Sequence, residues 1–240
     1  MDRFFDVSAF AYAHRGLWGG DIPENSLAAF QSARENGVGV ELDVRLSADG
    51  VVHVFHDPTL DRMCGLAAAF NTLTSEQLAG TFLPNGSPAP TLAVVLGVMG
   101  DLPVLIELKI EGPTDLAERV AGVIADHSGR MTVMSFDEPT VARLCQLVTD
   151  RPVGLLVGPA PVLGAEEVRM KAQRARAMGC DYLAPHFSSL AVAEETAGGL
   201  PLVTWTIREP EGLELARKHS AAPIFEGFSA ALAKPSQTPI

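Results

Sequence analysis

The sequence has few cysteines, a deficit of basic residues and no long hydrophobic run, and each shortage excludes a class of protein. Cys64, Cys145 and Cys180 lie far apart, so neither a disulfide framework nor a CxxC zinc site is expected. Eighteen basic against twenty-nine acidic residues give a net charge of −11, which argues against nucleic acid or an anionic membrane surface as partner. The start lacks a secretory pattern, and the longest apolar run, residues 92–100, is about half a membrane span. We therefore expect a cytoplasmic protein without stable membrane insertion.

Short strand-like segments alternate with amphipathic, helix-like segments along the chain. The strands are expected at residues 10–14, 38–44, 51–56, 103–109, 131–136, 152–157, 180–184 and 202–207. Asn25 or Ser26 begins one of the intervening helices, Asp137 begins another, and Gly179 ends a third. This alternation predicts an α/β fold of the (β/α)8 TIM-barrel type, in one domain spanning 1–240. A doubly wound open sheet is the alternative.

A long loop-like stretch interrupts the alternation after the third expected strand. It runs from about residue 57 to residue 90, whereas a βα loop usually takes about 2–6 residues. One short helix is expected inside it, because Thr74 and Gln77 form a capping-box pattern. An insertion of this size is expected to cover or shape a site.

Three acidic residues stand late in two of the expected strands. Glu41 and Asp43 share one face of "VGVELDV", and Glu107 shares a face of "PVLIELK" with Lys109. Inward-facing side chains at the carboxyl ends of barrel strands form active sites. Like charges gathered there need a cation between them, and an all-oxygen set suits Mg²⁺ or Ca²⁺. The alternative is a solvated strand end, with Lys109 either paired to a carboxylate or free to bind a phosphate oxygen.

Two histidines stand at the ends of other expected strands. His14 ends the first strand and is followed by Arg15, and His56 ends the third. Two imidazoles at one rim can act as the base and the acid of a proton transfer near neutral pH, and a guanidinium can hold an anion. The sequence does not say which histidine is the acid. His53 lies on the opposite face from His56 and is expected only to pack.

These residues lie in segments that resemble the glycerophosphodiester phosphodiesterase family. The segments are "HRG" at 14–16, "PENS" at 23–26, "ELDVRLSADG" at 41–50, "HDPTLDR" at 56–62, "PTLAVVL" at 90–96, "IELK" at 106–109, "VMSFDEPTVARL" at 133–144, "CDYLAP" at 180–185 and "TWTI" at 204–207. They span nearly the whole chain in order. The resemblance implies a TIM barrel with a small insertion after strand 3, and hydrolysis of a glycerophosphodiester to an alcohol and sn-glycerol 3-phosphate.

The resemblance also implies roles for single residues. These are His14 and His56 as the general acid/base pair, Glu41, Asp43 and Glu107 as ligands of one divalent cation, and Arg15, Lys109 and Trp205 as substrate contacts. Trp205 fits a pocket wall and a barrel core equally well, since a tryptophan buries a large area in either place. The implied partner is a small glycerophosphodiester. The leaving alcohol, the choice between Mg²⁺ and Ca²⁺, and the existence of a homo-oligomer stay open.

Three segments depart from the family's pattern. The insertion carries "MCGLAAAFNTLTSEQL" in place of the Thr-Thr and Gly-rich run that follows the arginine corresponding to Arg62. Arg208 stands where the family usually has asparagine, and it either adds a cation at the rim or faces solvent. The family's closing Asp-Gly-Ile-Ile-Thr-Asp is replaced by "FEGFSAAL", which retains only the Gly227 position. The departures concern substrate shape and the last helix start, not the groups expected to be catalytic.

Other functions would use some of the same residues. A phospholipase D-like lyase would act on lysophospholipids to give a cyclic phosphate, but such relatives are typically secreted and disulfide-bearing, and this chain has neither pattern. A non-catalytic phosphate-binding barrel would be favoured if either histidine were missing. An aldolase-type or enolase-type barrel would use the acids without the histidine pair, and a lysine base would be expected.

Overall fold

A closed barrel of parallel strands forms the centre of the molecule. The structure, a computed structural model, describes residues 5–112 and 114–233, so residues 1–4, 113 and 234–240 of the predicted domain lie outside its description. In those ranges the barrel strands are β1 (Tyr12–His14), β2 (Gly39–Leu46), β4 (Val104–Leu108), β5 (Met131–Ser135), β6 (Val153–Val157), β7 (Tyr182–Pro185), β8 (Leu202–Ile207) and β9 (Ala221–Phe225). The sheet closes because β1 pairs in parallel with both β2 and β9.

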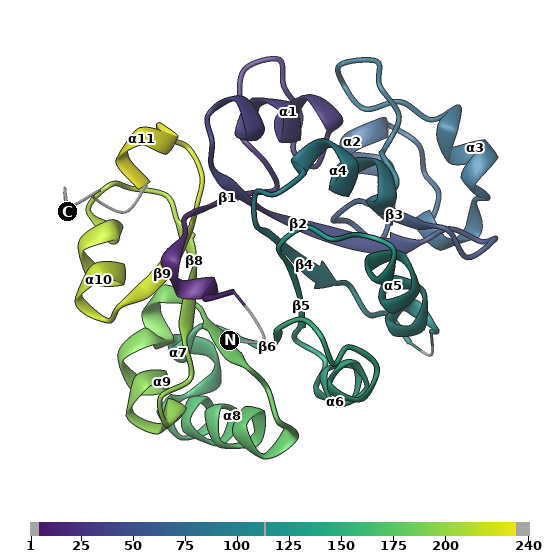
Figure 1. Cartoon of the computed structure of the whole chain (residues 1–240). Helices are drawn as coiled ribbons and strands as arrows, with labels where there is room; N and C mark the ends of the chain where they lie inside the picture. Colours follow the sequence, from purple (N-terminus) through teal and green to yellow (C-terminus); the bar gives the residue numbers. More distant parts are fainter. Residues whose placement is uncertain (1–4, 113, 234–240) are drawn as a thin grey trace.

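Helices surround the barrel, as Figure 1 shows. The α-helices are α1 (Leu27–Glu35), α2 (Asp61–Cys64), α3 (Ser75–Ala79), α4 (Leu92–Met99), α5 (Leu116–Ala125), α6 (Glu138–Leu147), α7 (Ala160–Leu163), α8 (Ala165–Met178), α9 (Leu190–Ala197), α10 (Gly212–Lys218) and α11 (Ala230–Ala233), and the 3₁₀ turns are η1 (Val7–Ala9), η2 (Phe70–Thr72) and η3 (Phe187–Ser189). Ser26 caps α1, Asp137 caps α6, and Gly179 ends α8 in the left-handed conformation. The expected TIM barrel is confirmed, together with these helix ends.

One of the expected barrel strands lies outside the barrel, and one barrel strand was not expected from the sequence. The third expected strand is β3 (Val52–Val54), which pairs antiparallel with the far end of β2 and lies outside the barrel. The eighth barrel strand is β9, between β8 and β1. Its sequence, "AAPIF", was overlooked because small residues and Pro223 are weak strand formers. The insertion therefore follows the third strand of the chain, but the second strand of the barrel.

The barrel interior is filled at one end. Tyr12 and Tyr182 lie fully buried inside it, and the Tyr12 hydroxyl donates a hydrogen bond of 2.8 Å to the carbonyl of Val7 in η1. Gly154 leaves room for the second ring, because a Cβ there would lie 2.3 Å from the Tyr182 side chain. A second and larger apolar core joins the outer face of the strands to the helices. Space for a ligand is therefore left at the carboxyl ends of the strands.

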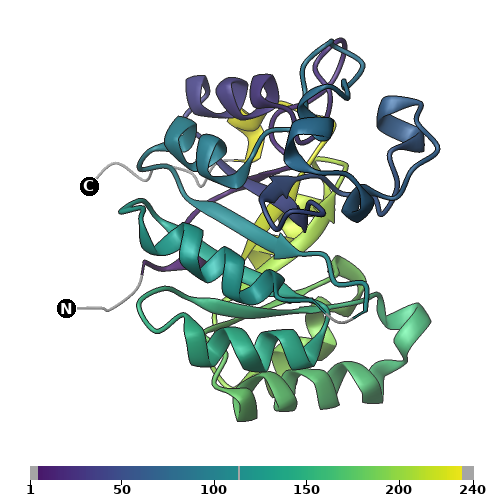
Figure 2. The same cartoon turned by 90° about the vertical axis from the view of Figure 1, so that its right-hand side faces the viewer.

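The segment between β3 and α4 packs on a small core of its own, built around Phe55, Phe70 and Leu78. The expected capping box of Thr74 and Gln77 begins α3. His53 is buried, as expected of a packing residue, and its ring nitrogens lie 2.9 Å from Ser75 Oγ and 3.3 Å from the Ala89 carbonyl oxygen. The insertion, blue at the upper right of Figure 2, is thereby tied to the barrel.

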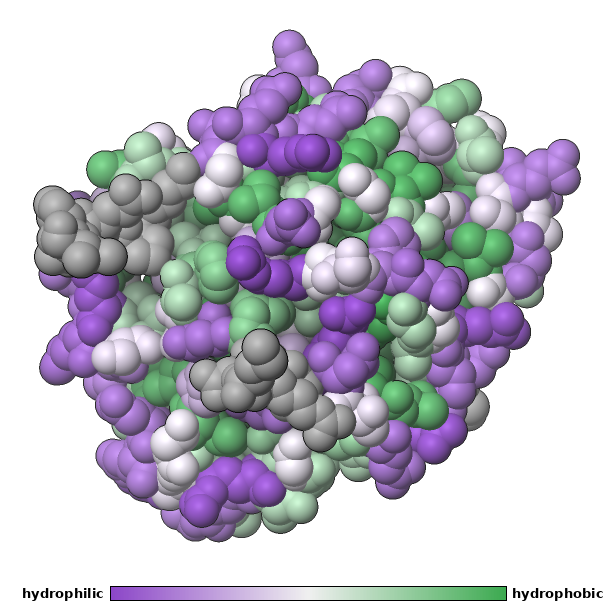
Figure 3. All heavy atoms as spheres, viewed as in Figure 1, coloured by the Kyte–Doolittle hydropathy of each residue, from purple (hydrophilic) through white to green (hydrophobic). Residues whose placement is uncertain are grey.

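Hydrophilic side chains are interspersed with small groups of hydrophobic ones over the face seen in Figure 3. Throughout residues 5–112 and 114–233, none of the helices is both long enough and apolar enough to cross a membrane.

Candidate active site

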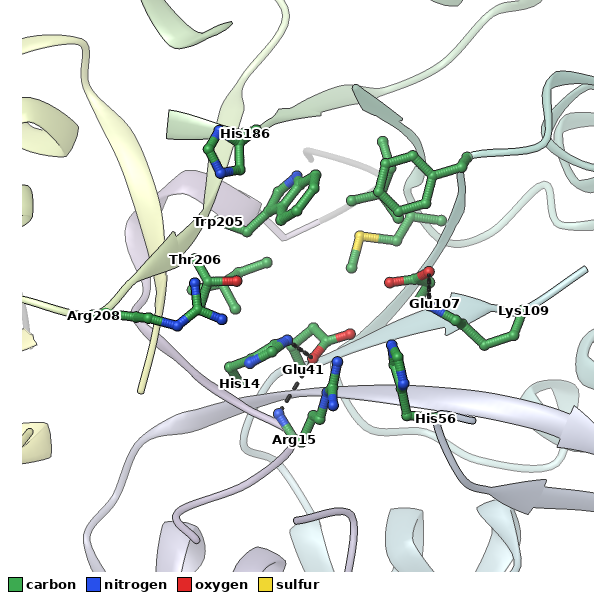
Figure 4. A pocket seen from close by; sticks show the side chains of 14 residues that line it. His14, Arg15, Glu41, His56, Glu107, Lys109, His186, Trp205, Thr206 and Arg208 are labelled. Carbon is green, nitrogen blue, oxygen red and sulfur yellow. Dashed lines mark hydrogen bonds and ion pairs between the residues drawn. The ribbon is translucent and has the colours of Figure 1, made fainter. Parts of the chain in front are cut away.

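The expected site residues meet at the carboxyl end of the barrel, most of them on the neighbouring strands β1, β2 and β4 or directly after them, with His56 following β3 and Trp205 lying in β8. The parallel register sets His14 of β1 beside Glu41 of β2, and Asp43 of β2 beside Glu107 of β4. Above them lies a cavity of about 330 Å³. Its lining, drawn in Figure 4, consists of His14, Arg15, Glu41, His56, Glu107, Lys109, Met134, Phe136, Leu156, His186, Trp205, Thr206, Arg208 and Ile224. Seven of the eight expected site residues line this cavity, and the eighth, Asp43, lies buried beneath it.

The carboxylates of Glu41, Asp43 and Glu107 form one buried cluster. Each offers an oxygen, and these three atoms lie within 4.8 Å of one another. Burial, and then the charge of Asp43, raises the pKa of Glu107 to about 7 and raises that of Glu41 well above its usual value. Such mutual repulsion is what a bound cation relieves, and three carboxylate oxygens are ligands that Mg²⁺ and Ca²⁺ accept. The residues present therefore fit one hard divalent cation.

Two basic side chains border the cluster. Lys109 Nζ lies 2.7 Å from Glu107 Oε1 and 3.5 Å from Asp43 Oδ1, and Arg15 Nε lies 3.3 Å from Asp43 Oδ2. Burial would raise the pKa of Asp43, but Lys109 and Arg15 together lower it, so this carboxyl stays ionised. Arg15 Nη1 also donates to Glu24 at 2.8 Å. Lys109 thus pairs with carboxylates and also lines the cavity, and its role in binding phosphate stays a prediction.

His14 is held by a carboxylate that the sequence analysis did not single out. His14 Nδ1 lies 2.5 Å from Oε2 of Glu226, and Oε1 of Glu226 lies 2.6 Å from Nε of Arg208. Burial would raise the pKa of Glu226, but the hydrogen bond with His14 and the charge of Arg208 lower it. An ionised Glu226 accepts the Nδ1 proton and leaves Nε2 of His14 for the cavity and for Glu41, which is 3.9 Å away.

His56 has a matching arrangement on the other side of the cluster. Its Nδ1 lies 2.7 Å from Asp57 Oδ1, and Arg62 Nε donates to Asp57 Oδ2 at 2.6 Å. The hydrogen bond from Arg62 lowers the pKa of Asp57 to about 2. Burial, together with the charges of Lys109 and nearby Arg15, lowers the pKa of His56, so its ring is largely neutral near pH 7.

The backbone at His56 is fixed by Arg45, a buried residue of β2. Arg45 donates to the His56 carbonyl oxygen from Nε at 2.9 Å and from Nη2 at 2.7 Å, and Nη1 lies 3.2 Å from Glu111 Oε2. A planar guanidinium can direct two donors to one oxygen. Arg45 thereby joins β2, the end of the β3 segment and the loop after β4, and it holds His56 over the cavity.

An aromatic wall faces the two histidines across the cavity in Figure 4. Trp205 is half-buried, donates its indole N–H to the Ala184 carbonyl at 2.8 Å, and makes edge contacts with Phe136 and His186. Trp205 therefore belongs both to the barrel core and to the pocket wall, because its ring packs on the barrel interior and also lines the cavity.

The residues that hold the two histidines are harder to predict from the sequence than the histidines themselves. Asp57 was signalled by its place directly after His56. Glu226 lies in the "FEGFSAAL" segment, directly after the overlooked strand β9, and that segment was expected to affect only the last helix start, whereas Glu226 contacts His14. Arg45 lies in the middle of a strand motif without any distinguishing sign.

Comparison with known proteins shows the family to which the chain belongs. The sequence model of the Glycerophosphoryl diester phosphodiesterase family matches residues 14–228. The Mycobacterium tuberculosis protein named "Probable glycerophosphodiester phosphodiesterase 2" is 30% identical over 84% of this chain and 80% of its own length, and the glycerophosphodiester phosphodiesterase of Caldanaerobacter subterraneus is 29% identical over 87% and 89%. The crystal structure of glycerophosphodiester phosphodiesterase from Thermotoga maritima has a TM-score of 0.74 at 25% identity and covers 90% of this chain and 94% of that one. The chain therefore belongs to the Glycerophosphoryl diester phosphodiesterase family.

Proposed function

We propose that this protein hydrolyses glycerophosphodiesters to an alcohol and sn-glycerol 3-phosphate, with one divalent cation and with His14 and His56 as the acid/base pair. One observation carries the proposal. Two histidines, each held at Nδ1 by a carboxylate that an arginine also binds, flank one cluster of three buried carboxylates.

Glu41, Asp43 and Glu107 would hold Mg²⁺ or Ca²⁺. When bound, such an ion neutralises the negative charge that develops on the phosphate oxygens. Arg15 and Lys109 border the same cluster and bind further phosphate oxygens, because both face the cavity and carry N–H donors. The phosphorus is thereby held between the two imidazoles.

Each imidazole is suited to move one proton. A carboxylate that accepts the Nδ1 proton leaves Nε2 of the neutral ring as a proton acceptor, and it stabilises the ring once that nitrogen is protonated. One histidine removes the proton from the attacking hydroxyl. The other protonates the oxygen of the departing alcohol. Attack by water gives sn-glycerol 3-phosphate directly, whereas attack by the substrate's glycerol hydroxyl gives a cyclic phosphate that water must open in a second step, with the proton-transfer roles of the two histidines exchanged. Asp57 and Glu226 act as positioning residues, through the histidines they hold.

The test is release of sn-glycerol 3-phosphate from glycerophosphocholine and glycerophosphoethanolamine with Mg²⁺, with Ca²⁺ and with a chelator. We expect metal-dependent release that falls at least about 100-fold in His14→Ala and in His56→Ala. The rise in melting temperature on adding the metal should persist in both variants, since neither histidine is a proposed ligand. His127→Ala, at the opposite end of the barrel before β5, is the matched control and should behave like the wild type.

Full turnover in either histidine variant would overturn its assignment. If no diester is hydrolysed with any metal, lysophospholipids are the next substrates, with a cyclic phosphate as the product to detect. Formation of that product would replace hydrolysis with the lyase reaction on the same residues.

A further inference from the structure

The two walls of the cavity differ in how their cations are engaged. On the cluster side, Arg15 pairs with Glu24 and Asp43, and Lys109 pairs with Glu107. On the opposite side, Arg208 Nε lies 2.6 Å from Glu226 Oε1, and no hydrogen-bond or ion-pair partner of the Arg208 side chain other than Glu226 is found in residues 5–112 and 114–233. Its side chain is 60% exposed. The ion pair holds the guanidinium in place, and the terminal NH₂ groups are left for a ligand.

Two further donors line the same wall. The backbone N–H of Ser188 donates to His186 Nδ1 at 3.2 Å, which places the proton of the neutral ring on Nε2. Thr206 adds a hydroxyl that lines the cavity. Figure 4 shows His186, Thr206 and Arg208 on the side of the cavity away from Lys109 and Glu107. They come from the ends of β7 and β8, so their donors face one region of the cavity.

The carboxylates nearby do not cancel this donor set. Of the cavity-lining residues in the described part of the chain, the acidic ones are Glu41 and Glu107, and both belong to the proposed cation cluster. Glu226 is 13% exposed, and its two oxygens already serve His14 and Arg208. The wall therefore offers N–H and O–H donors and a positive charge to a ligand.

We propose that Arg208, with His186 and Thr206, forms a subsite for a negatively charged group, a carboxylate or a second phosphate, on the alcohol that leaves the phosphodiester. This proposal rests on the proposed function, and it specifies glycerophosphodiesters with an anionic alcohol as the substrate class. The charge belongs to the leaving alcohol because the glycerol half of the substrate is uncharged. The fork of Arg208 suits either anion, since both present two oxygens side by side.

The same wall offers a competing surface for a cationic alcohol. Trp205 and Phe136 meet edge to face at 5.4 Å between ring centroids, and aromatic faces attract a quaternary ammonium. A positive charge there would lie beside Arg208, which repels it. The geometry therefore favours the anion, and choline becomes an outcome of the test.

Two matched substrate pairs isolate the negative charge. Glycerophosphoserine differs from glycerophosphoethanolamine by one carboxylate, and glycerophosphoglycerol phosphate differs from glycerophosphoglycerol by one phosphate. We expect the wild type to show a kcat/KM about tenfold higher for the charged member of at least one pair, which is the selectivity that one charge-assisted hydrogen bond provides. Selectivity within the first pair would show that the subsite binds a carboxylate, and selectivity within the second pair would show that it binds a phosphate.

The variants are Arg208→Gln and Arg208→Lys, with Arg217→Gln on α10 as control, because Arg217 pairs only with neighbouring Glu214 among the described residues. Arg208→Gln should bring the selectivity ratio close to one, Arg208→Lys should keep part of it, and the control should keep all of it. Removing Arg208 also removes its ion pair with Glu226, and that loss should lower the turnover of every substrate equally. The ratio of kcat/KM between the charged and the uncharged substrate therefore reports the subsite alone.

An unchanged ratio in Arg208→Gln, an equal loss for all substrates, or a wild-type preference for glycerophosphocholine would overturn the subsite. Failure of the proposed function looks different, because no diester would then be hydrolysed by any variant. In that case, the affinities of the protein for O-phosphoserine and for phosphoethanolamine, measured by calorimetry, still test the subsite. Tighter binding of phosphoserine that Arg208→Gln abolishes supports the subsite, and equal binding overturns it.

Discussion

Replacing Glu107 with Gln should stabilise the metal-free protein while removing its response to metal. The pKa of Glu107 is about 7 in the folded chain against an ordinary 4.5. Between those values the folded state binds more protons than the unfolded state, so the free energy of unfolding falls as the pH rises from 4.5 to about 7. The full difference corresponds to roughly 3 kcal/mol above pH 7. Because Gln cannot ionise, the metal-free variant should be roughly 3 kcal/mol more stable than the wild type at pH 8, and within about 1 kcal/mol of it at pH 5.

The assay is urea unfolding at pH 5 and pH 8, with a chelator and with Mg²⁺ or Ca²⁺. Metal at about 100 times its dissociation constant should raise the free energy of unfolding of the wild type by about 2.7 kcal/mol, and Glu107→Gln should lose most of that gain. Glu35→Gln on the exposed side of α1 is the matched control and should change neither quantity.

Two results would refute this reasoning. A metal-free Glu107→Gln protein less stable than the wild type at pH 8 would mean that the carboxylates do not repel one another as their spacing requires. An equal gain from metal in both proteins would remove Glu107 from the ligand set.

Three further outcomes are expected. Glu226→Gln should lower kcat roughly tenfold or more with little change in KM, while the metal-induced rise in melting temperature stays; an unchanged kcat would exclude its positioning role. Gly154→Ala should cost about 1–3 kcal/mol in urea unfolding, since its Cβ would meet the Tyr182 ring, and a neutral effect would contradict the tight barrel interior. Burial lowers the pKa of His53, so its stabilising contribution is present above pH 6.5 and is lost as the pH falls below it; His53→Gln should flatten that part of the stability curve, and an unaltered curve would exclude it.

Features that depend on near neighbours could be predicted from the sequence. Alternating inward and outward side chains mark a barrel strand, so Glu41 and Asp43 had to share a face wherever β2 lay. Helix caps are equally local, which is why Ser26 and Asp137 were found at their helix starts. The place of Glu107 and Lys109 at the end of β4 could be predicted as well, because the apolar run that forms the strand directly precedes them.

The direction of a strand and the partners of a side chain were decided only by the tertiary structure. The β3 segment looks like a barrel strand in sequence, and only its antiparallel pairing with β2 excludes it from the barrel. His14 and Glu226 are 212 residues apart, and they meet because β9 closes the barrel against β1. Arg208 is held toward the cavity by that same Glu226. Side-chain periodicity is a local property, whereas these contacts exist only once the sheet has closed on itself.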